Sequence, residues 1–125
     1  MLVNKIITFK DLIVWQKAHL LVLKIYKITK NFPRDEKYGL IDQMRRAAVS
    51  ITSNIAEGFY RRTLLDKNNF YSVALSSLAE LLNQIIISKD LSYIDNKTYV
   101  ELDNDVVEVR KLLSGLIKSS QSRKY

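Results

Sequence analysis

The sequence has no cysteine, one proline, three glycines and one histidine among its 125 residues. The absence of cysteine excludes disulfides, thiol catalysis and zinc–thiolate sites. One proline and three glycines are too few for the many turns of a β-sandwich, or for a disordered linker. A chain of this length can bury a core without covalent staples. We therefore expect residues 1–125 to form a single domain.

Long hydrophobic runs are also missing. The most apolar runs, "ITFKDLIVW" and "LLNQIIIS", are far shorter than the roughly 20 residues that a membrane-spanning helix needs. The N-terminus lacks the three-part layout of a signal peptide. We therefore expect a soluble cytoplasmic protein with no membrane partner.

Apolar residues recur with helical periodicity in four segments of the chain. The predicted helices cover about 9–30, 35–60, 64–88 and 96–118, and residues 119–125 form a frayed tail. The first helix should begin after Thr8, whose hydroxyl can cap it. Because the connections are short, neighbouring helices must run antiparallel. The predicted fold is all-α, an antiparallel up-down four-helix bundle.

The first predicted helix is apolar over too wide an arc for a single contact. Its arc covers roughly 200°, about twice what a surface helix needs. The excess predicts a second buried contact, and hence association of the chain with copies of itself.

The net charge of +7 is placed unevenly. Residues 1–62 hold twelve Lys and Arg against five Asp and Glu, whereas residues 63–125 hold eight of each. Such asymmetry points to an acidic partner, most often nucleic acid, because phosphates attract cations whatever the base sequence. Modest positive charge can also serve only to keep a helical protein soluble. Composition alone leaves both interpretations open.

Polar residues interrupt the second predicted helix, in the stretch "QMRRAAVSITSNIAEGFYRR". Their spacings of three and four place them along one polar ridge: Gln43, Arg46, Ser50, Asn54 and Glu57. Buried polar groups must be hydrogen-bonded, and Ser76 and Glu80 of the third helix are the candidate partners. We interpret the ridge as a structural device for close helix packing; the alternative is a ligand or catalytic site.

Catalysis is difficult to assemble from this sequence. His19 is the single histidine, and residue 16 is Gln, so the Glu-x-x-His element of di-iron bundles is missing. There is no nucleophile elbow and no Gly-rich phosphate loop. We predict a protein that is not an enzyme, with no catalytic residues, no cofactor and no metal.

Two arginine pairs bracket the ridge. Arg45-Arg46 and Arg61-Arg62 lie sixteen residues apart, roughly 24 Å along a helix. Together with nearby cations they suggest a surface that contacts phosphates, and the candidates are Arg34, Lys37, Arg45, Arg61, Arg62 and Lys67. Four aromatic residues lie near these cations in the sequence and could stack on unpaired bases if they are exposed: Tyr38, Phe59, Tyr60 and Tyr71. For Phe59 and Tyr71 we expect packing in the core instead. Arg61 and Arg62 can also simply complement the dipole at the helix C-terminus.

Three stretches, "FKDLIVWQKA", "NFPRDEKYGLIDQMRRAAVSITSNIAEG" and "SSLAEL", occur in this order. They closely resemble the bacterial four-helix bundle proteins encoded within intervening sequences of 23S ribosomal RNA genes. That family is similar to the accessory variability determinant of diversity-generating retroelements, a basic bundle that forms a pentameric barrel. There the barrel binds nucleic acid and a reverse transcriptase. The resemblance therefore implies a homopentamer, in agreement with the wide apolar arc of the first helix.

The leading hypothesis is a non-catalytic, homo-oligomeric bundle that binds RNA or DNA. The alternative is a scaffold that docks a protein partner, such as a reverse transcriptase, with its charge serving only to steer association.

Overall fold

The computed structural model describes residues 5–122, with side chains through residue 119. Two short 3₁₀ turns, η1 (Phe9–Asp11) and η2 (Arg34–Glu36), accompany four α-helices. The helices are α1 (Ile13–Thr29), α2 (Leu40–Phe59), α3 (Leu64–Asp90) and α4 (Asn96–Ser122). Residues 5–122 contain no strand. The prediction of an all-α chain with four helices is confirmed.

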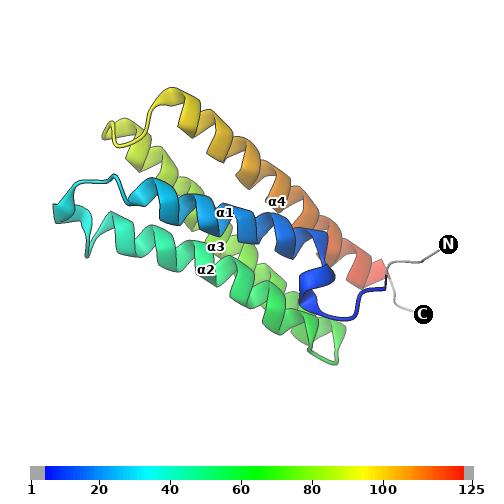
Figure 1. Ribbon diagram of the computed structural model, residues 1–125. Coiled ribbons are helices and arrows are strands. Elements are labelled where there is room, and N and C mark those ends of the chain that lie inside the picture. Colours follow the sequence, from blue (N-terminus) through cyan, green and yellow to red (C-terminus); the bar gives the residue numbers. More distant parts are fainter. Residues whose placement is uncertain (1–4, 123–125) are drawn as a thin grey trace.

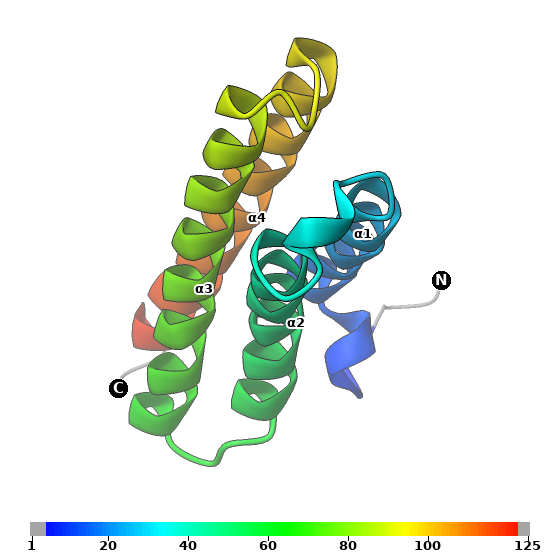
Figure 2. The same cartoon turned by 90° about the vertical axis from the view of Figure 1, so that its left-hand side faces the viewer.

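The helices pack in the order in which they occur in the chain, and α1 closes the bundle against α4. Figure 1 shows that successive helices run in opposite directions. The contacts agree, because Met44 of α2 lies beside Ser88 of α3, whereas Ser50 lies beside Ser77. At the end where α3 turns into α4, these two long helices project beyond α1 and α2 (Figure 2).

All four helices contribute to one core. On α2 the buried face has two small residues, Ala47 and Ala48, beside large ones. The largest fully buried side chains of the core are Tyr71, Leu21, Ile25, Met44, Ile51, Ile55, Leu78, Leu81, Ile85, Leu102 and Leu113.

The first helix begins later than predicted. Thr8 does act as a cap, and it forms a capping box with Asp11, but it caps the turn η1. Leu12 is extended, with φ −74° and ψ 125°, so that α1 starts only at Ile13. The turn lays Phe9 against the ring of Trp15, with 5.1 Å between ring centroids. This packing explains why the helix does not continue back to residue 9.

The other helix boundaries differ by a few residues. The second helix starts at Leu40, because residues 34–36 form η2 and Gly39 separates that turn from α2. The third continues to Asp90, and Ser92, at φ 63°, lies in the turn that follows. The fourth continues through residue 122, past its predicted end at 118. Residues 123–125 lie outside the described part of the chain.

By length and composition, α3 is apolar enough to cross a membrane, which the short apolar runs did not suggest. Core helices of soluble proteins pass the same test. One side of α3 carries a buried stripe that packs into the bundle: Tyr71, Ala74, Leu78, Leu81 and Ile85. That burial is what the core helix of a soluble bundle requires.

Gly58 of α2 lies where α2 packs closely against α3, and Gly115 of α4 is the control for it. A Cβ on Gly58 would lie 2.7 Å from Cε1 of the buried Tyr71 ring and 3.0 Å from Cβ of Phe70, whereas a Cβ on Gly115 would meet nothing within 4 Å. We expect Gly58→Ala to destabilise the fold by about 1–3 kcal/mol through overpacking. Gly115→Ala in α4 should stabilise it by about 0.5–1 kcal/mol. Urea unfolding measures both, and equal effects would contradict the close approach.

Candidate nucleic-acid interface

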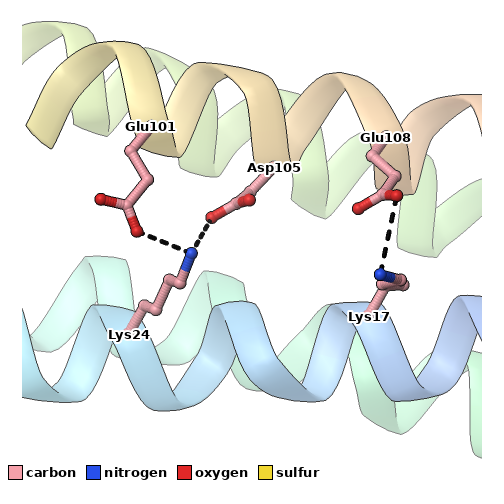
Figure 3. A network of polar contacts seen from close by, with 5 residues as sticks. All are labelled: Lys17, Lys24, Glu101, Asp105 and Glu108. Atoms are coloured by element: carbon pink, nitrogen blue, oxygen red, sulfur yellow. Dashed lines mark hydrogen bonds and ion pairs between the residues drawn. The ribbon is translucent and has the colours of Figure 1, made fainter. Parts of the chain in front are cut away.

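The lysines of α1 are partly neutralised by the acids of α4 (Figure 3). Lys24 Nζ lies 2.7 Å from Oδ2 of Asp105 and 2.8 Å from Oε1 of Glu101. The hydrogen bonds to Asp105 and then to Glu101 raise the pKa of Lys24. Lys17 Nζ lies 3.7 Å from Oε2 of Glu108. Part of the positive charge of residues 1–62 is therefore balanced across the bundle.

Most of the predicted phosphate-contacting cations have no such balance. Within residues 5–119, five of the six take part in no ion pair: Arg34, Lys37, Arg45, Arg61 and Arg62. The positive charge of these five residues near α2 is therefore not neutralised by a carboxylate.

These cations form two groups at opposite ends of α2. Arg34 and Lys37 precede the helix and Arg45 lies in its second turn, whereas Arg61, Arg62 and Lys67 follow its last residue. A helix of twenty residues is about 30 Å long. One copy of the chain therefore does not bring the six predicted residues together.

The first group lies at the corner where α1 leads into α2, which faces the viewer in Figure 2. Here a hollow of about 540 Å³ is lined by Thr29, Lys30, Phe32, Arg34, Lys37, Ile41 and Arg45. Four of these residues are cations and none is an acid. We call this the corner hollow. Sequence reasoning missed Lys30, although its position shortly before Arg34 and Lys37 was an available signal.

Arg45 is held in place by the end of α1. Its Nε donates to Oγ1 of Thr29 at 2.9 Å, and its Nη2 donates to the carbonyl of Tyr26 at 3.3 Å. Its guanidinium carbon lies 4.6 Å from the centre of the Tyr26 ring. A cation that bonds the last carbonyls of a helix also complements the helix dipole. Arg45 thus has a structural role and a fixed position in the corner hollow.

Glu36 also lies at this corner, and its carboxylate is hydrogen-bonded to uncharged donors. Glu36 accepts the backbone N–H of Leu40 at 3.1 Å and the hydroxyl of Tyr93 at 2.8 Å. The hydrogen bond from Leu40, followed by that from Tyr93, lowers the pKa of Glu36. Tyr93 also packs on Phe32, with ring centroids 5.2 Å apart. These contacts attach the corner to the turn between α3 and α4.

At the far end of α2 the cations contact their own chain. Lys67 Nζ donates to the carbonyl of Phe59 and so caps α2. The guanidinium carbon of Arg61 lies 4.4 Å from the centre of the Phe70 ring. The ring of Tyr60 packs edge-on against Phe59. The interpretation that a cation complements the C-terminus of α2 therefore fits Lys67, which bonds a carbonyl there, better than Arg61, which lies over an aromatic ring.

The centre of the polar ridge is hydrogen-bonded inside the bundle. Oγ of Ser50 lies 2.7 Å from Oγ of Ser77, and Nδ2 of Asn54 donates to the carbonyl of Ser50 at 2.8 Å. The partner on α3 is thus the buried Ser77. The expected partners are wrong, because Ser76 and Glu80 are exposed on α3.

The two ends of the ridge face solvent. Arg46 is exposed and pairs with Asp42 of its own helix at 3.0 Å, and Glu80 accepts from Gln84 of its own helix at 3.4 Å. Gln43 and Glu57 are exposed, and within the part of the chain described here they form no side-chain hydrogen bond or ion pair. The prediction of a continuous internal network is therefore wrong at Gln43, Arg46 and Glu57.

The remaining candidate for chemistry, His19, stacks on Trp15 with 4.8 Å between ring centroids. Residues 5–119 contain no group of three or more His, Asp or Glu placed to hold a metal ion.

Comparison with known proteins identifies the family. The model of the 23S rRNA-intervening sequence protein family matches residues 10–115, from within η1 to within α4. The chain belongs to this family. The further similarity to the accessory variability determinant, and the pentamer that it implies, stay predictions.

A solved structure supports the fold. The chain is similar to a protein of unknown function from the S23 ribosomal protein family of Bacteroides thetaiotaomicron VPI-5482, with 27% sequence identity and a TM-score of 0.76. The match covers 85% of this chain and 99% of the other. No curated protein matches.

The contrast between the neighbours Arg45 and Arg46 can be tested by stability. Arg45→Ala removes two hydrogen bonds from a charged donor and one contact with an aromatic ring, so we expect a loss of about 1–3 kcal/mol. Arg46→Ala removes one exposed ion pair on a single helix, which should cost at most about 0.5 kcal/mol. Thermal unfolding measures both variants. Equal losses would contradict the role of Arg45 at the end of α1.

Proposed function

We propose that the protein is a non-catalytic, cytoplasmic, antiparallel up-down bundle that assembles with copies of itself and binds nucleic acid. The observation that carries this proposal is the distribution of unpaired cations. Acids of α4 balance Lys17 and Lys24 on α1, whereas five cations near the two ends of α2 form no ion pair within residues 5–119: Arg34, Lys37, Arg45, Arg61 and Arg62.

The chemistry of these cations suits phosphate. Arginine offers five N–H donors in a planar fork that matches phosphate oxygens. Arg34 and Lys37 are exposed at one end of α2, and Arg61 and Arg62 at the other. Tyr38 and Tyr60, 85% and 59% exposed, lie next to these groups in the chain. An exposed ring next to cations is typical of surfaces that bind unpaired nucleotides.

Self-association is supported by the outer face of α1. Ile13, Leu20 and Leu23, each more than half exposed, follow one another at spacings of seven and three. Beside Ile13, a hollow of about 810 Å³ is lined largely by apolar residues of the N-terminal segment, α1 and α4. Contiguous exposed apolar surface marks an interaction site. A second copy of the chain is the proposed occupant, and the family resemblance implies five copies in all.

Assembly would multiply the cationic surface. Each copy contributes both ends of its α2, and several weak phosphate contacts on one strand raise the overall affinity far above that of each contact. A homo-oligomer of modestly basic chains therefore suits a long polyanion.

Nucleic-acid binding is tested by the dependence of affinity on salt. We expect the logarithm of the association constant to fall linearly with the logarithm of salt concentration, because binding releases counterions from phosphates. Reversing four cations at the ends of α2, with Arg34→Glu, Lys37→Glu, Arg61→Glu and Arg62→Glu, should abolish binding at physiological salt. Fluorescence anisotropy with labelled RNA and DNA measures both effects.

The control reverses four exposed cations of α4, with Lys97→Glu, Arg110→Glu, Lys111→Glu and Lys118→Glu, so that net charge changes equally. It should retain most of the affinity. Salt-independent binding, or the same loss in both variants, would reject a surface at the ends of α2.

Self-association is tested by mass. We expect light scattering to give a multiple of the 14.5 kDa chain, five-fold for a pentamer, and Leu20→Glu with Leu23→Glu to yield monomers, because charge would then lie in the apolar contact. Leu65→Glu, at a residue 73% exposed on α3, is the control and should leave the mass unchanged. A wild-type monomer at micromolar concentration would contradict the proposed assembly.

The same face of α1 also fits a protein other than a second copy. In that alternative the chain is a scaffold for a partner such as a reverse transcriptase, and its cations only steer association. A monomeric wild type that shifts no nucleic acid would favour this alternative.

A further inference from the structure

The corner hollow differs from a second hollow that cations line. Between α1 and α4, a hollow is lined by three lysines of α1 together with Asp105 and Glu108. There, acids of α4 pair with Lys17 and Lys24. The corner hollow has four cations and no acid among its lining residues. Like charges around one concave space repel one another, so an anion placed between them is strongly favoured.

The corner hollow also has hydrogen-bond donors that the protein itself does not use. Arg45 uses its Nε and one Nη2 hydrogen to bond the end of α1, whereas a guanidinium has five N–H donors. Because the end of α1 fixes Arg45, little of its freedom remains to be lost when it binds an anion. Lys30, Arg34 and Lys37 are exposed at the rim. The volume of about 540 Å³ lies within the range of about 300–1,000 Å³ typical of ligand sites.

An exposed aromatic residue adjoins the hollow. Tyr38 follows Lys37 directly and is 85% exposed, and the Lys37 ammonium lies 5.3 Å from the centre of its ring. By contrast, Tyr60 at the other end of α2 packs edge-on against Phe59 and Phe9. Tyr38 therefore offers a free ring face beside a cationic hollow. Only an unpaired base can stack on such a ring, because a duplex keeps its bases inside the helix.

From this juxtaposition we propose that the corner hollow binds a phosphate of single-stranded nucleic acid, with an unpaired base stacked on Tyr38. Arg45 is the fixed anchor for the phosphate, and Lys30, Arg34 and Lys37 close around it. This inference rests on the proposed function and adds the strand state, the residue Lys30 and a preference for one end of α2.

The experiment uses the full chain, a labelled single strand and the duplex of the same sequence. Arg34→Ala with Lys37→Ala should weaken binding of the single strand and lower the salt slope by up to about 0.7, the contribution of one phosphate of a single strand. Lys30→Ala should change both in the same direction, by less. Arg61→Ala with Arg62→Ala, an equal loss of charge at the other end, should change the slope less.

Tyr38→Ala tests the stacking. Loss of one stacked base should weaken binding of the single strand about tenfold or more, and leave both duplex binding and the salt slope unchanged. Tyr60→Ala is the matched control and should have the smaller effect. Tyr38 is almost wholly exposed, so its removal should not disturb the fold, and thermal unfolding of each variant verifies this.

The inference is overturned if the double variant Arg34→Ala with Lys37→Ala and the double variant Arg61→Ala with Arg62→Ala change the salt slope equally. It is also overturned if Tyr38→Ala affects single strand and duplex alike, or neither. Inorganic phosphate that displaces the single strand at equal phosphate concentration would indicate a site for a small anion and likewise overturn it. In all these outcomes salt-dependent binding by the wild type would preserve the proposed function. A wild type that binds neither strand state would remove both.

Discussion

The pairing of α1 with α4 determines where the charge of this molecule remains. Lys24 lies between two carboxylates of α4, and Lys17 contacts a third. Partly exposed ion pairs of this kind contribute little to stability. Their main consequence is electrostatic, because they reduce the field along the outer edge of the bundle. Arg34, Lys37, Arg61 and Arg62, near the ends of α2, form no ion pair within residues 5–119, so their charge stays available to an anion.

The close packing of α2 against α3 positions these ends. Gly58 leaves room for the ring of Tyr71, and Ser50 contacts Ser77 across the two helices. Two cations then serve helix ends directly, since Arg45 bonds the end of α1 and Lys67 bonds the end of α2. A basic residue in this fold can therefore be a cap, an ion-pair partner or a free cation, and only its surroundings distinguish the three.

The candidate site was predictable in kind and less so in detail. The spacing of Ser50 and Asn54 correctly indicated a polar contact inside the bundle. The partner was misassigned by one residue, to Ser76 instead of Ser77, because one step along a helix turns a side chain by about 100°. The same rotation places Arg45 against α1 and leaves Arg46 in solvent. The spacing in the sequence predicts the ridge, but the rotation of each packed helix about its axis decides which of two neighbouring residues is buried.

The sequence by itself determined the four helices, the absence of thiol chemistry and the family, because helical periodicity, composition and motifs are local properties of the chain. It did not determine that Leu12 is extended, since the packing of Phe9 on Trp15 sets the start of α1. It also did not determine which cations remain unpaired. Lys24 and Asp105 are 81 positions apart, and Lys30 joins Arg45 only where α1 meets α2. Such charges are balanced or left free by contacts that exist only once the helices pack.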